Sequence, residues 1–152
     1  MTYEKNNHIC YDIYDVNYNG CSFYGGSCIG GGEKQSKRQV TLIRSYNKIY
    51  RKCKKNFKYD GPQLEMNQDS YKEFKIWDKE LNRVYKLLYK GLSAKQKKVL
   101  KKKQIRWIKK KEKEAAKEAA QWAGGSGQPL ARNMVLITET KKRLRWLIRT
   151  YA

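Results

Sequence analysis

The chain has 152 residues, enough for one domain with a modest hydrophobic core. Lys and Arg outnumber Asp and Glu by 35 to 14, and the resulting formal charge of +21 predicts attraction to polyanions. No apolar run approaches the ~20 residues of a membrane span. The chain has one histidine, no nucleophile elbow, no phosphate loop and no metal-ligand pair at standard spacing. We therefore expect no catalytic residues, no cofactor and no membrane span.

Residues 1–33 are rich in Tyr, Gly and Cys. Strand-forming side chains precede Asn19-Gly20, a dipeptide preferred in tight hairpin turns. The pattern predicts a β-hairpin arm with strands at about 9–18 and 21–24. The first eight residues lack the charged-then-apolar pattern of a secretory signal. Either the protein stays inside the cell, or a signal has been cut away.

Four cysteines lie in the first third of the chain. An even number permits two disulfides, in any of three pairings, and free thiols are a second interpretation. A zinc site that combines these cysteines with His8 is a third, although the chain has no C-x-x-C. The four are Cys10, Cys21, Cys28 and Cys53.

Residues 34–60 are predicted to form a basic helix. Val40, Ile43, Tyr46 and Cys53 recur at helical spacing. Nine basic residues and no acidic residue lie between positions 34 and 55. Asp60-Gly61-Pro62 then ends the segment, and proline suits the first turn of a following helix.

Residues 61–152 are predicted to form three amphipathic helices. The first covers about 63–92, and Ser93 with Gln96 forms a capping-box pattern that opens the second. The second runs to about residue 123, and Pro129 opens the third. The expected inward faces are Tyr71, Phe74, Trp77, Leu81, Val84, Tyr85, Leu88 and Leu92; Leu100, Gln104, Trp107, Ile108, Ala115, Ala119 and Trp122; and Leu130, Met134, Ile137, Leu144, Ile148 and Tyr151. Short connections favour antiparallel neighbours, so the predicted fold is a mainly α, antiparallel bundle of three to four helices with an N-terminal β-hairpin arm.

Five short motifs occur in order along residues 64–147. They are Glu65-Met66-Asn67, D-x-x-L-N-x-x-Y at Asp78 to Tyr85, Q-x-x-W at Gln104 to Trp107, Gly125-Ser126, and T-x-x-R at Thr140 to Arg143. This combination resembles the LprI-type lysozyme inhibitor domain. The resemblance implies a helical, non-enzymatic inhibitor, periplasmic or secreted, whose target is a protein such as a lysozyme.

The chain also departs from that family's pattern. By our matching, places where family members carry cysteines hold Asp69, Ala115 and Val135 here, and Cys53 alone answers to an upstream family cysteine. The disulfide framework that the resemblance implies is therefore missing from the helical part.

Four carboxylates gather on one face of the helix predicted at 63–92 and are expected to flank its apolar stripe. They could form a docking strip for a cationic partner, or they could neutralise lysines of the next helix. The glycine-serine turn could enter a target's cleft, or it could be a plain helix–helix linker. The candidate partner-binding residues are Glu65, Asp69, Glu73, Glu80, Gly125 and Ser126.

Between positions 95 and 113 the chain has eleven Lys or Arg residues and one acid, Glu112. Such a helix could track phosphates or a teichoic-type wall polymer by counterion release, or it could simply be a solvated face. The candidate polyanion-binding residues are Lys97, Lys98, Lys101, Lys102, Lys109 and Lys110.

Two amides, Asn82 and Gln104, lie beside apolar stripes and are expected to bond each other, Arg143 or a loop carbonyl. The sequence as a whole predicts a non-enzymatic binding protein that acts by steric occlusion of a target protein. The alternatives are a basic protein that binds nucleic acid or an anionic wall polymer, and an immunity-type protein that neutralises an acidic toxin.

Overall fold

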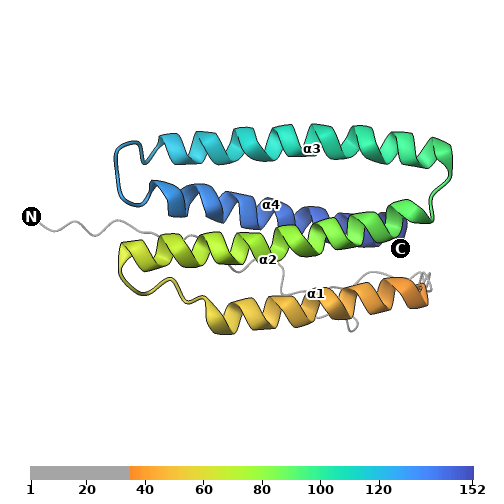
Figure 1. Ribbon diagram of the computed structural model, residues 1–152, viewed down its shortest axis with the longest axis horizontal. Helices are drawn as coiled ribbons and strands as arrows, with labels where there is room; N and C mark the ends of the chain where they lie inside the picture. The colour runs from red at the N-terminus through yellow and green to blue at the C-terminus, as the bar shows by residue number, and fades with distance from the viewer. Residues whose placement is uncertain (1–34) are drawn as a thin grey trace, which may run out of the picture. The chain divides into compact units, whose positions relative to one another are not determined.

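The computed structural model describes residues 35–152, which form four α-helices. They are α1 (Lys37–Asn56), α2 (Gln63–Lys90), α3 (Ala94–Ala120) and α4 (Gln128–Tyr151). Successive helices run antiparallel (Figure 1). The prediction of a mainly α bundle is confirmed for the described residues, which contain four helices and no strand. The predicted β-hairpin arm lies outside them.

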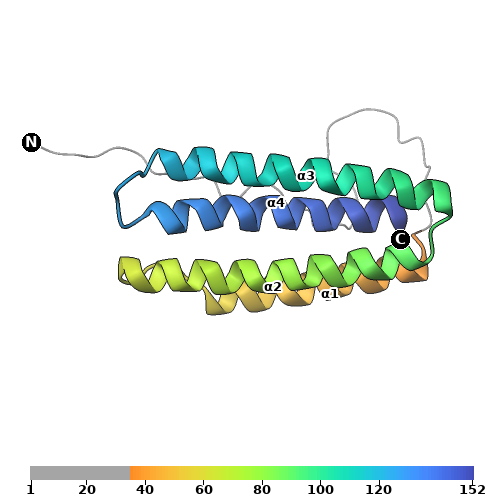
Figure 2. The same cartoon turned by 45° about the horizontal axis from the view of Figure 1, so that its top comes forward.

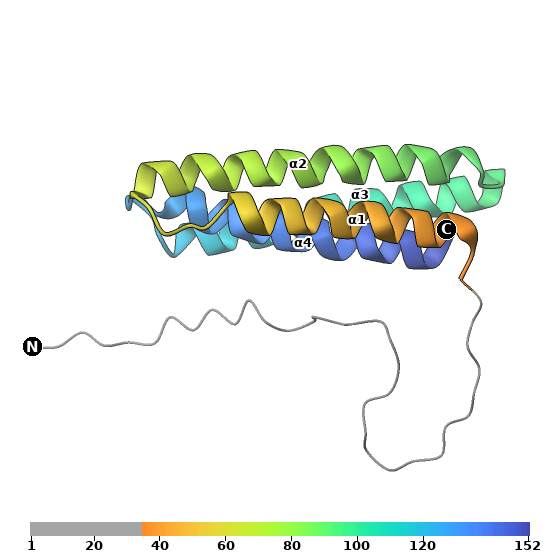
Figure 3. The same cartoon turned by 90° about the horizontal axis from the view of Figure 1, so that it is seen from below.

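The central helix of this unit is α4. It packs most extensively on α2 and α3, and it also contacts α1. Figure 2 shows α4 between α2 and α3, and Figure 3 shows α1 lying along α2 and α4. None of the described helices is long and apolar enough to cross a membrane.

The helix boundaries follow the capping signals in the sequence. The Ser36 side chain accepts a hydrogen bond from the Gln39 amide at 3.0 Å, which satisfies one free donor at the start of α1. At the start of α3, the predicted capping box is present, with bonds of 3.3 and 3.0 Å between Ser93 and Gln96. Pro129 opens α4, as predicted.

The core is a continuous apolar cluster. It contains eight of the predicted inward residues, and six more pack against it partly buried. Burial of each large side chain stabilises the fold by roughly 1.5–3 kcal/mol. Its buried members are Leu42, Cys53, Trp77, Leu81, Val84, Leu88, Leu100, Ile137, Leu144, Leu147 and Ile148.

Three of the predicted inward residues are exposed, and those predictions are wrong. Tyr71 is 55% exposed because the polar residues Ser70 and Glu73 occupy the inward positions of that turn. Ile108 is 43% exposed, since the inward position is taken by Lys111. Trp122 is 47% exposed because α3 ends at Ala120, before this residue.

A buried carboxylate joins three separate parts of the chain. Glu73 of α2 is 4% exposed, and its Oε1 accepts hydrogen bonds from Trp77 Nε1 and Lys141 Nζ, each at 2.9 Å. Its Oε2 accepts from the hydroxyl of Tyr59, in the α1–α2 loop. Burial, followed by the hydrogen bond to Glu73, raises the pKa of Tyr59, so its phenol stays a donor. This cluster fixes α2, α4 and the α1–α2 loop together.

Replacing Glu73 by Ala should leave the Lys141 ammonium partly buried and unpaired. We expect the free energy of unfolding to fall by about 3–5 kcal/mol, as for other broken buried ion pairs. Urea denaturation followed by circular dichroism measures this change. The exposed Glu65→Ala is the matched control and should alter stability by no more than about 0.5 kcal/mol. Equal effects of the two substitutions would contradict a structural role for Glu73.

Cys53 is a buried thiol, 3% exposed, with no disulfide partner among residues 35–152. Burial, followed by the nearby Glu73 carboxylate, raises the pKa of this thiol from 9.0 to about 11. The unfolded chain therefore loses this proton at a lower pH than the folded chain. The contribution of the neutral thiol to stability is complete below pH 9 and is lost as the pH rises towards 11.

We expect the wild-type protein to lose stability between pH 9 and pH 10 more steeply than Cys53→Ala, which lacks the titrating thiol. Urea denaturation of both proteins at several pH values makes the comparison. Peptide mapping after alkylation at pH 8.5 adds a second readout, because Cys53 should react far more slowly in the folded protein than in urea. Equal alkylation rates would contradict the buried position.

Candidate functional site

Two loops and the start of α2 meet at one end of the helical unit. The α1–α2 loop and the α3–α4 loop both lie at the end where α2 begins (Figure 1). The Asn67 side chain of α2 donates a hydrogen bond to the Ser126 carbonyl at 2.9 Å, and Gln63 donates to Asn67 at 2.9 Å. We call residues 57–69 and 121–128 together the loop end.

The α3–α4 loop has a tight, exposed backbone. Gly124 has φ 76°, a conformation that favours glycine. Hydrogen bonds from Gly125 N to the Trp122 carbonyl (2.9 Å) and from Gln128 N to the Gly125 carbonyl (3.2 Å) close successive turns. A Cβ on Gly127 would lie only 3.4 Å from the Trp122 ring. The Trp122 side chain therefore packs over the loop backbone and stiffens it.

A shallow hollow of about 160 Å³ lies where the α1–α2 loop meets the start of α2. Three carboxylates contribute to it: Asp60, Glu65 and Asp69. Asp69 pairs with Lys72 at 2.9 Å, but the exposed geometry of that pair gives it little strength. In a protein this basic, the hollow is a local concentration of negative charge suited to a cationic side chain. The lining residues are Asn56, Lys58, Tyr59, Asp60, Gly61, Glu65, Met66 and Asp69.

The six predicted partner-binding residues separate into two groups. Glu65 and Asp69 line the hollow, whereas Gly125 and Ser126 lie in the α3–α4 loop, which Asn67 contacts from another side of α2. The α3–α4 loop and the start of α2 are about sixty positions apart in the sequence, and the Asn67–Ser126 hydrogen bond shows that they are neighbours.

The other two predicted partner-binding residues, Glu73 and Glu80, are interior, so the expectation that all four carboxylates flank the apolar stripe is wrong. Glu73 and Glu80 are 4% and 7% exposed. Glu80 accepts hydrogen bonds from Ser45 of α1 at 2.9 Å and from Arg83 at 2.6 and 2.7 Å. Both carboxylates turn inward because donors from other parts of the chain satisfy them there.

The six predicted polyanion-binding lysines are not equivalent. Lys98, Lys101, Lys102, Lys109 and Lys110 are exposed on α3. Lys97 is half-buried, and its ammonium lies 5.6 Å from the centre of the Tyr89 ring.

Sequence reasoning missed a buried lysine. Lys111 is 5% exposed, with its ammonium 5.2 Å from the Phe74 ring centre and 5.1 Å from that of Trp107. Its Nζ also lies 3.3 Å from Glu112, which Arg132 contacts at 2.7 Å. Lys111 follows two other lysines in the sequence, and nothing in that run shows that its side chain faces inward. The only sequence signal for its burial is the aromatic residues at helical spacing, whose rings attract an ammonium group.

The Q-x-x-W and T-x-x-R motifs meet where α3 packs on α4. Gln104 Oε1 accepts a hydrogen bond from Arg143 Nε at 2.9 Å, which confirms one of the predicted partners. The Arg143 guanidinium lies 3.9 Å from the Trp146 ring centre and 5.6 Å from that of Trp107. Burial lowers the pKa of Arg143. These motif residues join two helices rather than forming an open site.

Asn82, the other amide singled out from the sequence, is exposed and does not join this cluster. Its Nδ2 donates to the Asp78 side chain at 3.0 Å and to the Asp78 carbonyl at 2.9 Å. The prediction that it bonds Gln104, Arg143 or a loop carbonyl is therefore wrong. Asp78, one helical turn away, accepts the hydrogen bonds of the Asn82 amide instead.

The geometry defines a helical bundle in which two loops meet the start of α2 at one end. The family described as "Lysozyme inhibitor LprI" matches residues 53–147, more than half of the chain. The protein therefore belongs to this family. The match begins at Cys53, eleven residues before the resemblance noted in the sequence. No curated protein and no solved structure matches the chain.

Asn67→Ala should release the α3–α4 loop from α2, because it removes the donor to the Ser126 carbonyl. We expect a loss of about 1 kcal/mol in unfolding free energy and faster amide hydrogen exchange confined to residues 124–128. Hydrogen exchange read by mass spectrometry tests this expectation. Asn82→Ala, which removes an exposed amide bonded within its own helix, is the control. Unchanged exchange in the loop of Asn67→Ala would show that this bond does not hold the loop.

Proposed function

We propose that this protein inhibits a lysozyme by steric occlusion, and that the loop end is the surface that meets the enzyme. The proposal rests on membership in a lysozyme inhibitor family together with one geometric observation. That observation is the Asn67–Ser126 hydrogen bond, which holds the glycine loop against the start of α2, the same helix end whose residues line the acidic hollow. We also propose the periplasmic or secreted location that the family implies.

The glycine loop has the properties of a cleft-filling element. Residues 121–126 are exposed, and Gly124 and Gly125 carry no side chain that would widen the loop. The Asn67 bond and the Trp122 ring hold it in place before binding. A preorganised loop loses less conformational freedom when it binds, which strengthens association.

The negative charge at the loop end attracts a cationic enzyme, although the net positive charge of the whole chain repels it. The net charge of +21 repels a cationic lysozyme at long range, whereas Asp60, Glu65 and Asp69 attract cationic groups at contact. At physiological salt the Debye length is about 8 Å, so distant lysines are largely screened while contacts at the hollow persist. The uncharged glycine loop would then enter the cleft, where glycoside hydrolases carry their paired carboxylates.

The test is an inhibition assay against a c-type lysozyme, with binding measured in parallel at low salt and at physiological salt. Glu65→Lys/Asp69→Lys should weaken inhibition at least tenfold by reversing the charge of the hollow, an effect of about 1.4 kcal/mol or more. Ser126→Trp should weaken it by a similar factor, because the thicker loop no longer fits a narrow cleft.

The matched controls lie elsewhere on the bundle. Asp78→Lys/Glu139→Lys makes the same change in net charge, and Asp78 is ~20 Å along α2 from Glu65 at 1.5 Å per residue. Thr150→Trp adds the same bulk at the opposite end of α4. Both controls should inhibit as the wild type does. Inhibition that survives both loop-end changes, or no inhibition by the wild type at either salt, would refute the proposal.

A further inference from the structure

Seven basic side chains form a single row along α3, one at nearly every turn. All seven are exposed. At about 100° per residue they fall within roughly 100° of one another, and at 1.5 Å per residue the row is ~33 Å long. No ion pair of residues 35–152 includes any of them. This α3 basic row consists of Lys95, Lys98, Lys102, Arg106, Lys109, Lys113 and Lys117.

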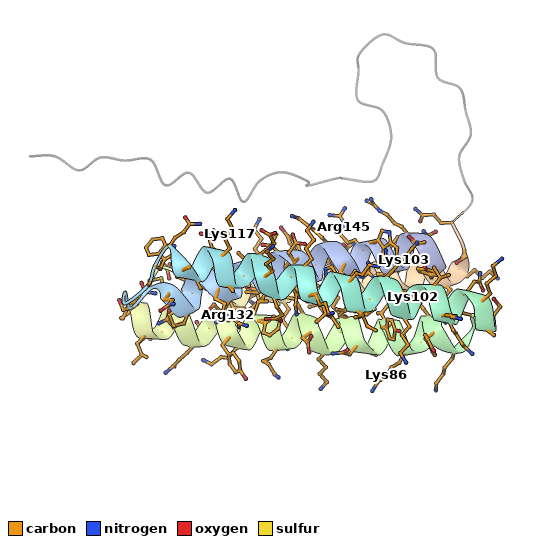
Figure 4. All side chains as sticks on the ribbon, turned by 90° about the horizontal axis from the view of Figure 1, so that it is seen from above. Lys86, Lys102, Lys103, Lys117, Arg132 and Arg145 are labelled. Atoms are coloured by element: carbon orange, nitrogen blue, oxygen red, sulfur yellow. The ribbon has the colours of Figure 1, made fainter. Side chains whose placement is uncertain are left out.

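Acidic residues are kept away from the row. The acids of α3 are Glu112, Glu114 and Glu118, which lie about 90° or more from its midline. Other helices add positive charge at its sides: in Figure 4, which looks down on α3, Arg145 of α4 is on one side and Lys86 of α2 on the other. The row is therefore the centre of a broader positive surface.

The row has an energetic cost for the unbound protein. Like charges three and four residues apart on a helix repel each other. The first turn of α3 contains no acid, and lysines lie where the helix dipole disfavours cations. A bound polyanion would relieve both effects, whereas nothing in the fold requires basic residues at these solvent-facing positions.

We propose that the α3 basic row binds a flexible, single-stranded phosphodiester chain. A single strand can lie along a straight row, while the strands of a duplex wind away from it. Trp107, the one aromatic residue of α3, is half-buried against Lys111 and Arg143, so the row binds the chain through its phosphates and not by stacking bases. A membrane surface fits less well, because an interfacial helix buries its apolar face in lipid and that face of α3 packs on α4.

A shorter row on α1 provides an internal comparison. It contains Lys37, Arg44, Lys48, Arg51 and Lys55, with Thr41 in place of a basic residue at one turn. The α3 row is longer and has no such gap, so it should contribute most of the affinity. This inference goes beyond the proposed function, because no member of the α3 row belongs to the loop end.

The probe is a fluorescently labelled 20-mer of abasic DNA, a phosphodiester chain without bases. Its binding is measured by anisotropy beside that of a (dT)20 strand, a glycerol-phosphate polymer, a 20-base-pair duplex and vesicles rich in phosphatidylserine. We expect the abasic chain, (dT)20 and the glycerol-phosphate polymer to bind alike, and tighter than the duplex or the vesicles. The slope of log K against log salt should be about −5, at roughly −0.7 per neutralised phosphate for seven contacts.

Lys102→Gln/Arg106→Gln/Lys109→Gln should weaken binding of the abasic chain at least tenfold and reduce the slope by about 2. Lys48→Gln/Arg51→Gln/Lys55→Gln on α1 removes the same charges at nearly the same spacing and should weaken binding less than threefold. Glutamine keeps a helix propensity close to that of lysine and arginine, so both triple variants should fold. Equal losses of affinity in the two variants would show that binding depends on net charge alone, and would overturn the proposal. Tighter binding to the duplex or to vesicles than to the abasic chain would overturn it as well.

Discussion

The carboxylate of Glu73 is the interaction on which the arrangement of the helices depends. Burying a charge is costly unless it is paired and hydrogen-bonded, and this one has an ammonium, an indole and a phenol as donors. The donors come from α4, from α2 itself and from the α1–α2 loop. Because all three must reach one group, the rotation of α2 and the path of that loop are fixed together. The loop end, with its acidic hollow, is a consequence of that constraint.

The parts of the fold that could be predicted from the sequence are those that local chemistry determines. Ser93, Gln96 and Pro129 act within one turn of their own positions, so the starts of α3 and α4 could be predicted from them. Most of the apolar stripes followed in the same way from their spacing. These signals need no knowledge of what lies across the core.

The wrong inward predictions at Tyr71 and Ile108 have one physical origin, which is that polar residues occupy the inward positions there, whereas Trp122 is exposed because α3 ends before it. Ser70, Glu73 and Lys111 face the interior, and a pattern read from apolar residues alone therefore placed Tyr71 and Ile108 inside. The partners that make such burial tolerable are distant in the sequence: Ser70 accepts from Asn133 at 3.0 Å, and Glu73 pairs with Lys141. No local signal distinguishes a carboxylate that will find such partners from one that will not. The same limit applied to the candidate site, where Glu65 and Asp69 resembled Glu73 and Glu80 in sequence but not in environment.

The family motifs divide between the helix scaffold and the loop end. Gln104, Trp107 and Arg143 hold α3 against α4, so these motif residues identify a scaffold. Ser126, by contrast, is a motif residue at the loop end, and its carbonyl is bound by Asn67. The exposed lysines of α3 lie outside the core, and solvated charges add little to folding energy. Their number can therefore change without disturbing the bundle, so a strongly basic protein can carry an acidic hollow at the loop end, the surface that we propose meets a partner.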